Sequence, residues 1–238
     1  MKRLVLLSSI ATALGLSPSL HAQEEGASSI SYNMAFTTDY RYRGFSQSRN
    51  MPAFNGGFDY ANDNGFYAGL WASTIRWIQD GGGDASIEVD VYAGKSGDFN
   101  ESVSYDFGIL QYMYPNNELD PTADTTEIYG GIGFGIASFT YYYAPTDLFG
   151  YDGTDGSQYY DLTVDLPSIA EVDISVHYGY QDIANTEDSY SDYSISFSKD
   201  IGFATVDLSI IGTDVDATFV KGKDIVKTSA ILSVSKEF

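Results

Sequence analysis

The sequence predicts an all-β protein, a closed antiparallel transmembrane β-barrel whose strands, about 12 of them, follow one another as an up-and-down meander. Apolar and polar residues alternate with a period of two along most of the chain, and turn residues separate the alternating runs. No segment after residue 22 is apolar enough to form a spanning helix. Because backbone groups cannot stay unpaired in hydrocarbon, strands that cross a membrane must close into a barrel.

The N-terminal segment has the layout of an export signal. Two basic residues precede an apolar run from Leu4 to Leu16, and Ala22 supplies a small residue before the acidic part of the chain begins. A membrane anchor is the alternative, but it needs roughly 20 apolar residues, and serine, threonine and proline interrupt this run. We therefore expect residues 1–22 to be a cleaved signal peptide and residues 23–238 to form a single β-barrel domain.

Charge and composition exclude several classes of binding partner and cofactor. Removal of residues 1–22 leaves 10 basic against 33 acidic side chains, a formal net charge of −23. Such a surface repels nucleic acid over roughly a Debye length, so no nucleic-acid partner is expected. The sequence contains no cysteine, which excludes a disulfide framework and thiolate metal sites. No cofactor is expected.

The first expected strand, 30–42, shows the alternation most plainly. Its even positions are mostly apolar, among them Ile30, Tyr32, Met34 and Phe36, and its odd positions are polar. A strand sends successive side chains to opposite faces, so this run has one apolar face. The next two runs, 54–60 and 66–78, flank the tight-turn sequence Asn62–Gly65. The register of 66–78 stays open because this run is apolar on both faces.

The same alternation returns along the rest of the chain. The remaining expected strands are 87–93, 103–113, 128–134, 139–143, 160–166, 172–180, 193–197, 206–210 and 230–238. Connections after odd-numbered strands tend to be long, whereas those after even-numbered strands are mostly shorter. Long loops at one end and short turns at the other are typical of outer-membrane barrels.

Aromatic residues near the expected strand ends add to this interpretation. The candidates for an aromatic girdle in the headgroup zone are Tyr40, Tyr42, Tyr60, Trp77, Tyr112, Tyr114, Tyr143, Tyr180, Tyr190 and Phe238. A secreted β-sandwich would show the same alternation. The absence of any expected helix, the aromatic C-terminal residue and the scarcity of lysine on the polar faces favour the barrel.

Several sequence blocks resemble a known family. The opening blocks Asp39–Gln47 and Gly65–Ser73, with later likenesses such as Tyr112–Pro115 and His177–Gly179, resemble the TorF-type porins of proteobacteria over nearly the whole mature chain. The resemblance implies an outer-membrane location and a pore-like role. The C-terminal strand also looks like the signal read by the barrel-assembly machinery, with an aromatic last residue preceded by apolar alternate positions, from which Lys236 departs.

If the apolar faces contact lipid, the polar faces enclose a lumen. The candidate pore-lining residues are Asp39, Arg41, Arg43, Asp59, Glu88, Asp90, Asp106, Glu127, Asp161, Asp165 and His177. Arg41 and Arg43 share one face of the first expected strand, where we expect them to oppose acidic residues across the lumen as a constriction. The alternative is that these pairs only fill the barrel with a satisfied polar core.

The resulting prediction is a porin-like channel for passive passage of small hydrophilic or charged solutes through a net acidic lumen. Its partners would be outer-membrane lipids, the assembly machinery during biogenesis and small solutes. The alternative is a non-conducting outer-membrane barrel that acts as an adhesin, another surface-interaction protein or a structural protein.

No enzyme is predicted. His177, the sole histidine after residue 22, is expected to point inward, whereas a lipid hydrolase needs its site at the lipid face. Acidic loop residues such as Asp147, Asp152 and Asp155 offer oxygen ligands for Ca²⁺ but lack a fixed loop signature, so no metal site is predicted.

Overall fold

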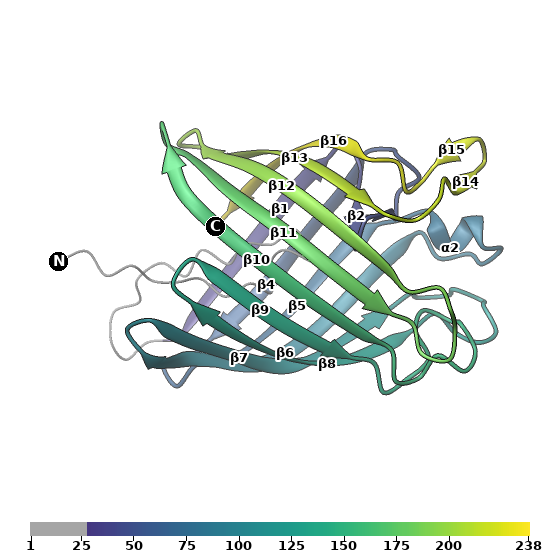
Figure 1. Ribbon diagram of the computed structural model, residues 1–238, viewed down its shortest axis with the longest axis horizontal. Coiled ribbons are helices and arrows are strands. Elements are labelled where there is room, and N and C mark those ends of the chain that lie inside the picture. Colours follow the sequence, from purple (N-terminus) through teal and green to yellow (C-terminus); the bar gives the residue numbers. More distant parts are fainter. Residues whose placement is uncertain (1–27) are drawn as a thin grey trace.

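Twelve antiparallel strands form a closed barrel in the computed structural model, which describes residues 28–238 (Figure 1). The strands are β1 (Ser29–Thr37), β4 (Ala53–Ala61), β5 (Phe66–Thr74), β6 (Ile87–Asn100), β7 (Val103–Met113), β8 (Thr125–Phe134), β9 (Ala137–Tyr143), β10 (Gln158–Ile169), β11 (Val172–Asp182), β12 (Tyr190–Asp200), β13 (Thr205–Thr213) and β16 (Ser229–Glu237). Each barrel strand pairs with the next one along the chain, and β1 pairs with β16 to close the ring. The predicted barrel and its strand number are confirmed, and the sandwich alternative is excluded. The expected signal peptide, 1–22, lies outside the described residues and stays a prediction.

Three short elements lie in the connections. The hairpin β2 (Arg41–Tyr42) and β3 (Phe45–Ser46) follows β1, the helical turn α2 (Trp77–Asp80) follows β5, and the hairpin β14 (Phe219–Val220) and β15 (Lys223–Asp224) precedes β16. Within residues 28–238, no helix is both long and apolar enough to span a bilayer.

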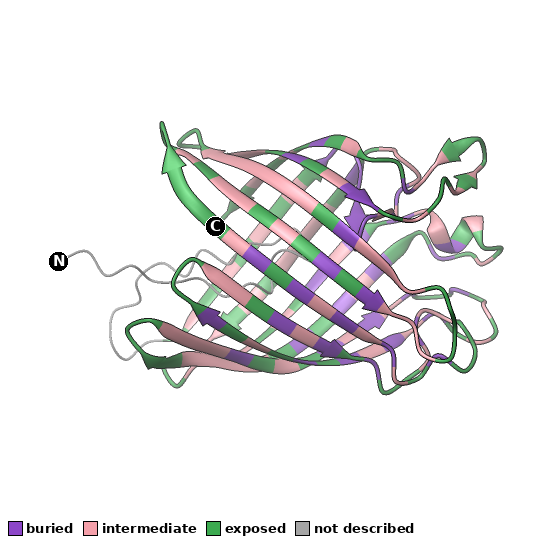
Figure 2. Cartoon of the chain, viewed as in Figure 1, coloured by how far each residue is buried: buried purple, intermediate pink, exposed green. Residues whose placement is uncertain are grey.

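An apolar band covers the outside of the barrel. The even positions of β1 point outward, so that Ile30 and Met34 are each 57% exposed, and the odd positions point inward. Aromatic rings pair across neighbouring strands, with centroids 5.5 Å apart for Tyr32 and Phe58. Figure 2 shows the alternation as exposed and buried stretches along each strand. Exposure of large apolar side chains around a whole barrel is the pattern expected of a surface in contact with lipid.

The same alternation settles the register of β5. Trp71 and Ser73 are buried on the inner face, whereas Phe66 and Leu70 are exposed on the outer face. The third expected strand is therefore an ordinary barrel strand with an inward tryptophan. It ends at Thr74, four residues before the predicted end at Ile78, because the chain turns into α2.

The two ends of the barrel differ. Residues 62–65, 101–102, 135–136, 170–171 and 201–204 form short turns at one end, here called the turn end, where the final residues of β16 lie beside β1. Six longer connections lie at the opposite end, here called the loop end, together with α2 and the β14–β15 hairpin (Figure 1). The turn at Gly65 needs glycine, because φ is +79° and a Cβ atom would meet Ser96 O at 2.1 Å.

The first predicted strand is too long. It was expected to run through Tyr42, but β1 ends at Thr37, and residues 38–52 leave the barrel wall. The alternation of tyrosine with charged residues continues past Thr37, so periodicity alone does not mark the end. The strand pairing does, because Thr37 is the last residue that pairs with both β4 and β16. Farther on, the φ values of +45° and +85° at Arg43 and Gly44 turn the chain back in the β2–β3 hairpin.

The predicted aromatic girdle is right at some positions and wrong at others. Tyr60, Tyr143, Tyr180 and Phe238 are exposed on the outside. The exceptions are Tyr40, Tyr42, Tyr112 and Tyr114, which are buried, and Trp77 and Tyr190, which are half-buried and pack against Tyr114 and Phe45. The reason for the two residues at the end of β7 is parity: its outward residues, such as Phe107 and Ile109, are odd-numbered, so even-numbered residues point inward.

Candidate functional site

The segment 38–52, here called the inward loop, folds into the loop end of the barrel. Its polar and aromatic side chains are buried almost throughout, including Asp39, Tyr40, Arg41, Tyr42 and Arg43. Arg41 pairs with Ser46 and Tyr42 with Phe45 in the β2–β3 hairpin. The tip at Gly44 lies close to β12 and β13, where a Cβ atom would meet Thr213 Cβ at 2.9 Å.

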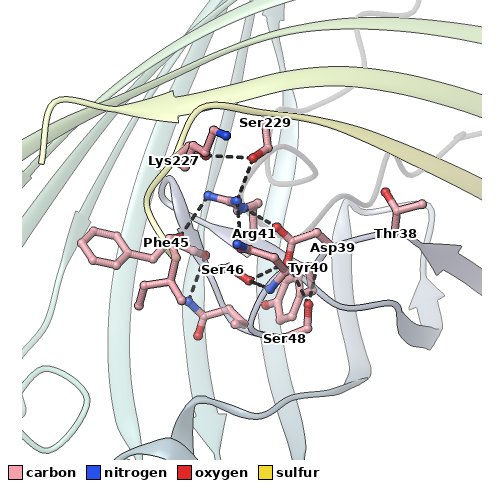
Figure 3. A network of polar contacts seen from close by, with 12 residues as sticks. Thr38, Asp39, Tyr40, Arg41, Phe45, Ser46, Ser48, Lys227 and Ser229 are labelled. Carbon is pink, nitrogen blue, oxygen red and sulfur yellow. Dashed lines mark hydrogen bonds and ion pairs between the residues drawn. The ribbon is translucent and has the colours of Figure 1, made fainter. Parts of the chain in front are cut away.

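Asp39 organises the base of the inward loop (Figure 3). Its Oδ1 accepts hydrogen bonds from Ser46 Oγ at 2.5 Å and Ser48 Oγ at 2.9 Å, and Arg41 Nε donates to its Oδ2 at 2.6 Å. The Arg41 guanidinium also donates to Ser229 Oγ at 3.3 Å and to the backbone oxygen of Ile225 at 3.1 Å. The loop is thus closed on itself and attached to the start of β16.

Arg43 spans the lumen from the inward loop to the opposite wall. Its Nη1 and Nη2 donate to the two carboxylate oxygens of Glu127 on β8 at 2.9 and 2.8 Å, and Nη1 also donates to Gln181 on β11 at 2.7 Å. The guanidinium carbon lies 3.9 Å from the ring centroid of Tyr159 on β10 and 5.3 Å from that of Tyr142 on β9. Four strands of the far wall therefore hold this one side chain.

The Arg43 side chain stays charged in this setting. Burial alone would lower the pKa of Arg43, but the Glu127 carboxylate and the neighbouring tyrosines outweigh burial and raise this pKa well above its ordinary value. A bidentate arginine–carboxylate pair with aromatic faces around it is the geometry in which a buried guanidinium is best compensated.

Aromatic side chains fill the lumen around this ion pair. Tyr42 and Tyr112 share a hydrogen bond at 3.1 Å, and Tyr112 Oη donates to Glu127 at 3.2 Å. Phe149, from the connection between β9 and β10, packs edge-on against both tyrosine rings, with centroids 5.4 and 5.3 Å away. At the loop end, the barrel is therefore blocked by packed side chains.

A second polar cluster lies next to the inward loop. His177 on β11 sits between two carboxylates, with Nε2 3.0 Å from Asp192 Oδ1 and Nδ1 3.5 Å from Asp161 Oδ2. Tyr159 Oη donates to Asp192 Oδ2 at 2.9 Å. A cavity of about 40 Å³ is lined by His177 and Asp192 of this cluster together with Arg43 and Gly44. As expected, His177 faces the interior and not the lipid side.

Asp192 is a member of this cluster that the sequence reasoning missed. The tenth expected strand began at residue 193, whereas β12 begins at Tyr190 and includes Asp192. The residue has the same parity as Ser194 and Ser196, which point inward, so the alternation extended by one step would have included it.

The predicted pore-lining residues fall into three groups. Glu88, Asp90, Asp106, Glu127 and Asp161 are buried on inward positions of the wall. Asp59 and His177 are partly exposed inside the barrel, and Asp165 is exposed near the turn end. Asp39, Arg41 and Arg43 belong to the inward loop and not to the first strand, which corrects their expected placement on the wall. Whether these residues line a path for solutes stays a prediction.

Of the two arginines expected to oppose acids across the lumen, only Arg43 does so. Arg43 meets an acid of the far wall, Glu127, whereas Arg41 pairs within its own loop with Asp39. Asp90 differs from Glu127 and Asp39, because neither of its carboxylate oxygens has a hydrogen-bond partner among residues 28–238.

A closed barrel of twelve strands with an apolar exterior, a polar interior and long loops at one end defines an outer-membrane β-barrel of the porin fold. Two solved structures are similar to it. The KdgM porin in complex with disordered oligogalacturonate shares 9% sequence identity, with a TM-score of 0.54 over 89% of this chain and 98% of that chain. The NanC porin shares 12% identity, with a TM-score of 0.55 over 87% of this chain and 98% of that chain.

Sequence comparison then places the chain more narrowly. It belongs to the family described as "Bacterial protein of unknown function (Gcw_chp)", whose model matches residues 21–238. The TorF-type name is not confirmed by this match, and that finer resemblance stays a prediction. A search of curated proteins finds no match.

Proposed function

We propose that the protein is a narrow porin-like channel for small hydrophilic solutes, that it prefers cations, and that the inward loop is its constriction. The observation that carries the proposal is the placement of Arg43, which crosses the interior of a porin-fold barrel and binds Glu127 on the opposite wall. A side chain in that position controls any route along the barrel axis.

The cation preference follows from the charges of the interior. The described acids on inward positions or in the inward loop include Asp39, Asp59, Glu88, Asp90, Asp106, Glu127, Asp161, Asp165, Asp192 and Asp207. Opposite them stand Arg41, Arg43 and His177, each already in contact with a carboxylate. An excess of fixed negative charge in a narrow lumen concentrates cations and repels anions.

In this proposal, the arrangement described above is the closed state of the channel. Barrels of about 8 strands are filled by side chains and barrels of about 16 enclose a wide channel, so twelve strands leave room for a pore only where no loop enters. Here Arg43, Tyr42 and Phe149 occupy that room. In this proposal, solutes pass when the inward loop moves away from the β8–β11 wall.

The test is single-channel recording of the purified protein in planar bilayers under a salt gradient. We expect a small conductance with a cation-selective reversal potential, and we expect Asp165→Asn to shift that potential toward zero because it removes a solvent-exposed charge on an inward position of β10. Asp188→Asn, on the exposed loop 183–189, is the matched control and should leave the potential unchanged. Protein that never conducts would overturn the channel proposal.

A second candidate function rests on the same blocked interior. A barrel whose loop end is filled by packed side chains and carries six long connections could serve as a surface-interaction protein without conducting. Deletion of one of these loops, such as 183–189, would then abolish binding to cells. Loss of that binding in a protein that does not conduct would favour this function over the channel.

A further inference from the structure

One cavity of the described chain lies outside the lumen. It has a volume of about 250 Å³ and lies at the loop end, between the inward loop and the segment that contains α2. The polar side chains that line it are those of Ser48, Thr74, Arg76, Gln79 and Ser86.

This cavity borders the apolar outside of the barrel. Thr74, the last residue of β5, has the outward parity of Phe66 and Leu70 and is exposed. Thr74 pairs in register with Ile87, another exposed outward residue. Its Oγ1 accepts a hydrogen bond at 3.1 Å from the backbone N–H of Phe54, a residue that is itself 66% exposed. The cavity therefore lies where the apolar band meets the loops, at the depth of lipid headgroups.

The charge of the cavity is unusual for this molecule. No acidic side chain lines it, although the chain contains 33. Arg41, Arg43 and Arg49 each bind a carboxylate, whereas the Arg76 side chain has neither an ion pair nor a hydrogen bond with any residue in the range 28–238. An arginine without a carboxylate, in an otherwise acidic protein, leaves its donors free for an anion from outside the chain.

We propose that this cavity binds the phosphate group of a lipid headgroup in the outer leaflet of the membrane. Arg76 would supply the charge and a planar set of donors that matches phosphate, and Gln79 and Ser86 would add an amide and a hydroxyl donor. Ser48 Oγ already donates a hydrogen bond to Asp39, and Thr74 Oγ1 accepts one from the Phe54 backbone N–H. These two residues therefore line the cavity but are not assigned to the phosphate. Acyl chains of the bound lipid would lie along Phe54 and Ile87. The proposal does not depend on conduction.

Native mass spectrometry of the full chain in detergent tests the proposal, with diphosphoryl lipid A and its dephosphorylated form as probes. We expect the wild-type protein to retain diphosphoryl lipid A, and Arg76→Gln to weaken this binding by about tenfold or more, since a charge-assisted contact is lost. Lys227→Gln, which removes an exposed charge at the same end of the barrel, is the matched control and should bind as the wild type does.

Two further measurements test whether the variants are folded and whether the bound group is a lipid or a free anion. Heat-modifiable gel migration of both variants should match the wild type, which shows that the barrel has formed. Millimolar inorganic phosphate should not displace the lipid, because it lacks the acyl chains. Equal binding by Arg76→Gln, equal binding of dephosphorylated lipid A, or displacement by inorganic phosphate alone would overturn the proposal.

Discussion

Arg43 shows how a charge is kept in the interior of this barrel. Removal of a guanidinium from water is costly, and the attraction of one carboxylate repays it only when the geometry is good and the remaining donors are satisfied. Here Glu127 accepts two hydrogen bonds, Gln181 accepts a third, and the Tyr159 ring covers the guanidinium face, while Arg43 Nε has no hydrogen-bond partner among residues 28–238. Replacement of either charged partner alone leaves the other buried without compensation.

A double-mutant cycle measures this coupling. We expect Arg43→Met and Glu127→Gln each to lower the free energy of unfolding by about 3–5 kcal/mol, and the double variant to lose much less than the sum. Urea unfolding from lipid vesicles supplies the four free energies.

The exposed pair of Lys199 and Glu171 is the control for that cycle. It lies at the turn end, where solvent screens the charges, so its coupling should stay below about 1 kcal/mol. Equal coupling energies for the two pairs would contradict the special role assigned to the buried one.

At the scale of elements, periodicity predicts where strands run but not where a loop turns inward. Each of the twelve expected runs overlaps a barrel strand, although the first and third extend several residues past the strand end, because one face of each must meet lipid. The start of the inward loop was predicted as part of the first strand, because Tyr40 and Tyr42 continue the alternation that defines β1. Their partners, Glu88 and Tyr112, belong to strands far along the chain, and no local pattern reports such contacts.

Replacement of residues 40–50 by a flexible glycine–serine linker tests the part played by the inward loop. The pairing of β1 with β4 and β16 ends at Thr37, so the barrel should still form and show heat-modifiable migration. We expect its conductance in planar bilayers to rise severalfold, because Tyr42 and Arg43 no longer cross the loop end. The same replacement in loop 183–189 should leave conductance unchanged; an unaltered conductance in the first variant would show that the loop is no constriction.

At the scale of the whole molecule, the apolar band is what sequence predicts best. Its residues obey one rule, a period of two, and lipid contact enforces this rule around the entire barrel. The interior obeys no such rule. Asp90 and Asp161 were predicted as inward from parity, but their neighbours depend on strand tilt and on which side chains the loops insert.

Leu208 offers a test of the band as a lipid-facing surface. It lies in the middle of β13, is 46% exposed, and pairs in register with Phe197 and Leu232 of the same face. We expect Leu208→Arg to lower the free energy of unfolding from vesicles by about 2–4 kcal/mol. Ser175→Arg, on an inward position beside Asp165, should cost far less. Similar costs at the two positions would mean that the outer face does not contact lipid.

The junction between the first and last strands has a particular dependence on the inward loop. β1 shares five register pairs with β16 but nine with β4, which makes this junction the shorter of the two. Arg41 bonds to Ile225 and Ser229, next to the start of β16, so the segment after β1 fastens the strand that arrives last in synthesis. Before β16 is in place, Arg43 already has Glu127 on β8 and Gln181 on β11 as partners, whereas Arg41 still lacks Ile225 and Ser229. The base of the hairpin is therefore fastened only after the ring has closed.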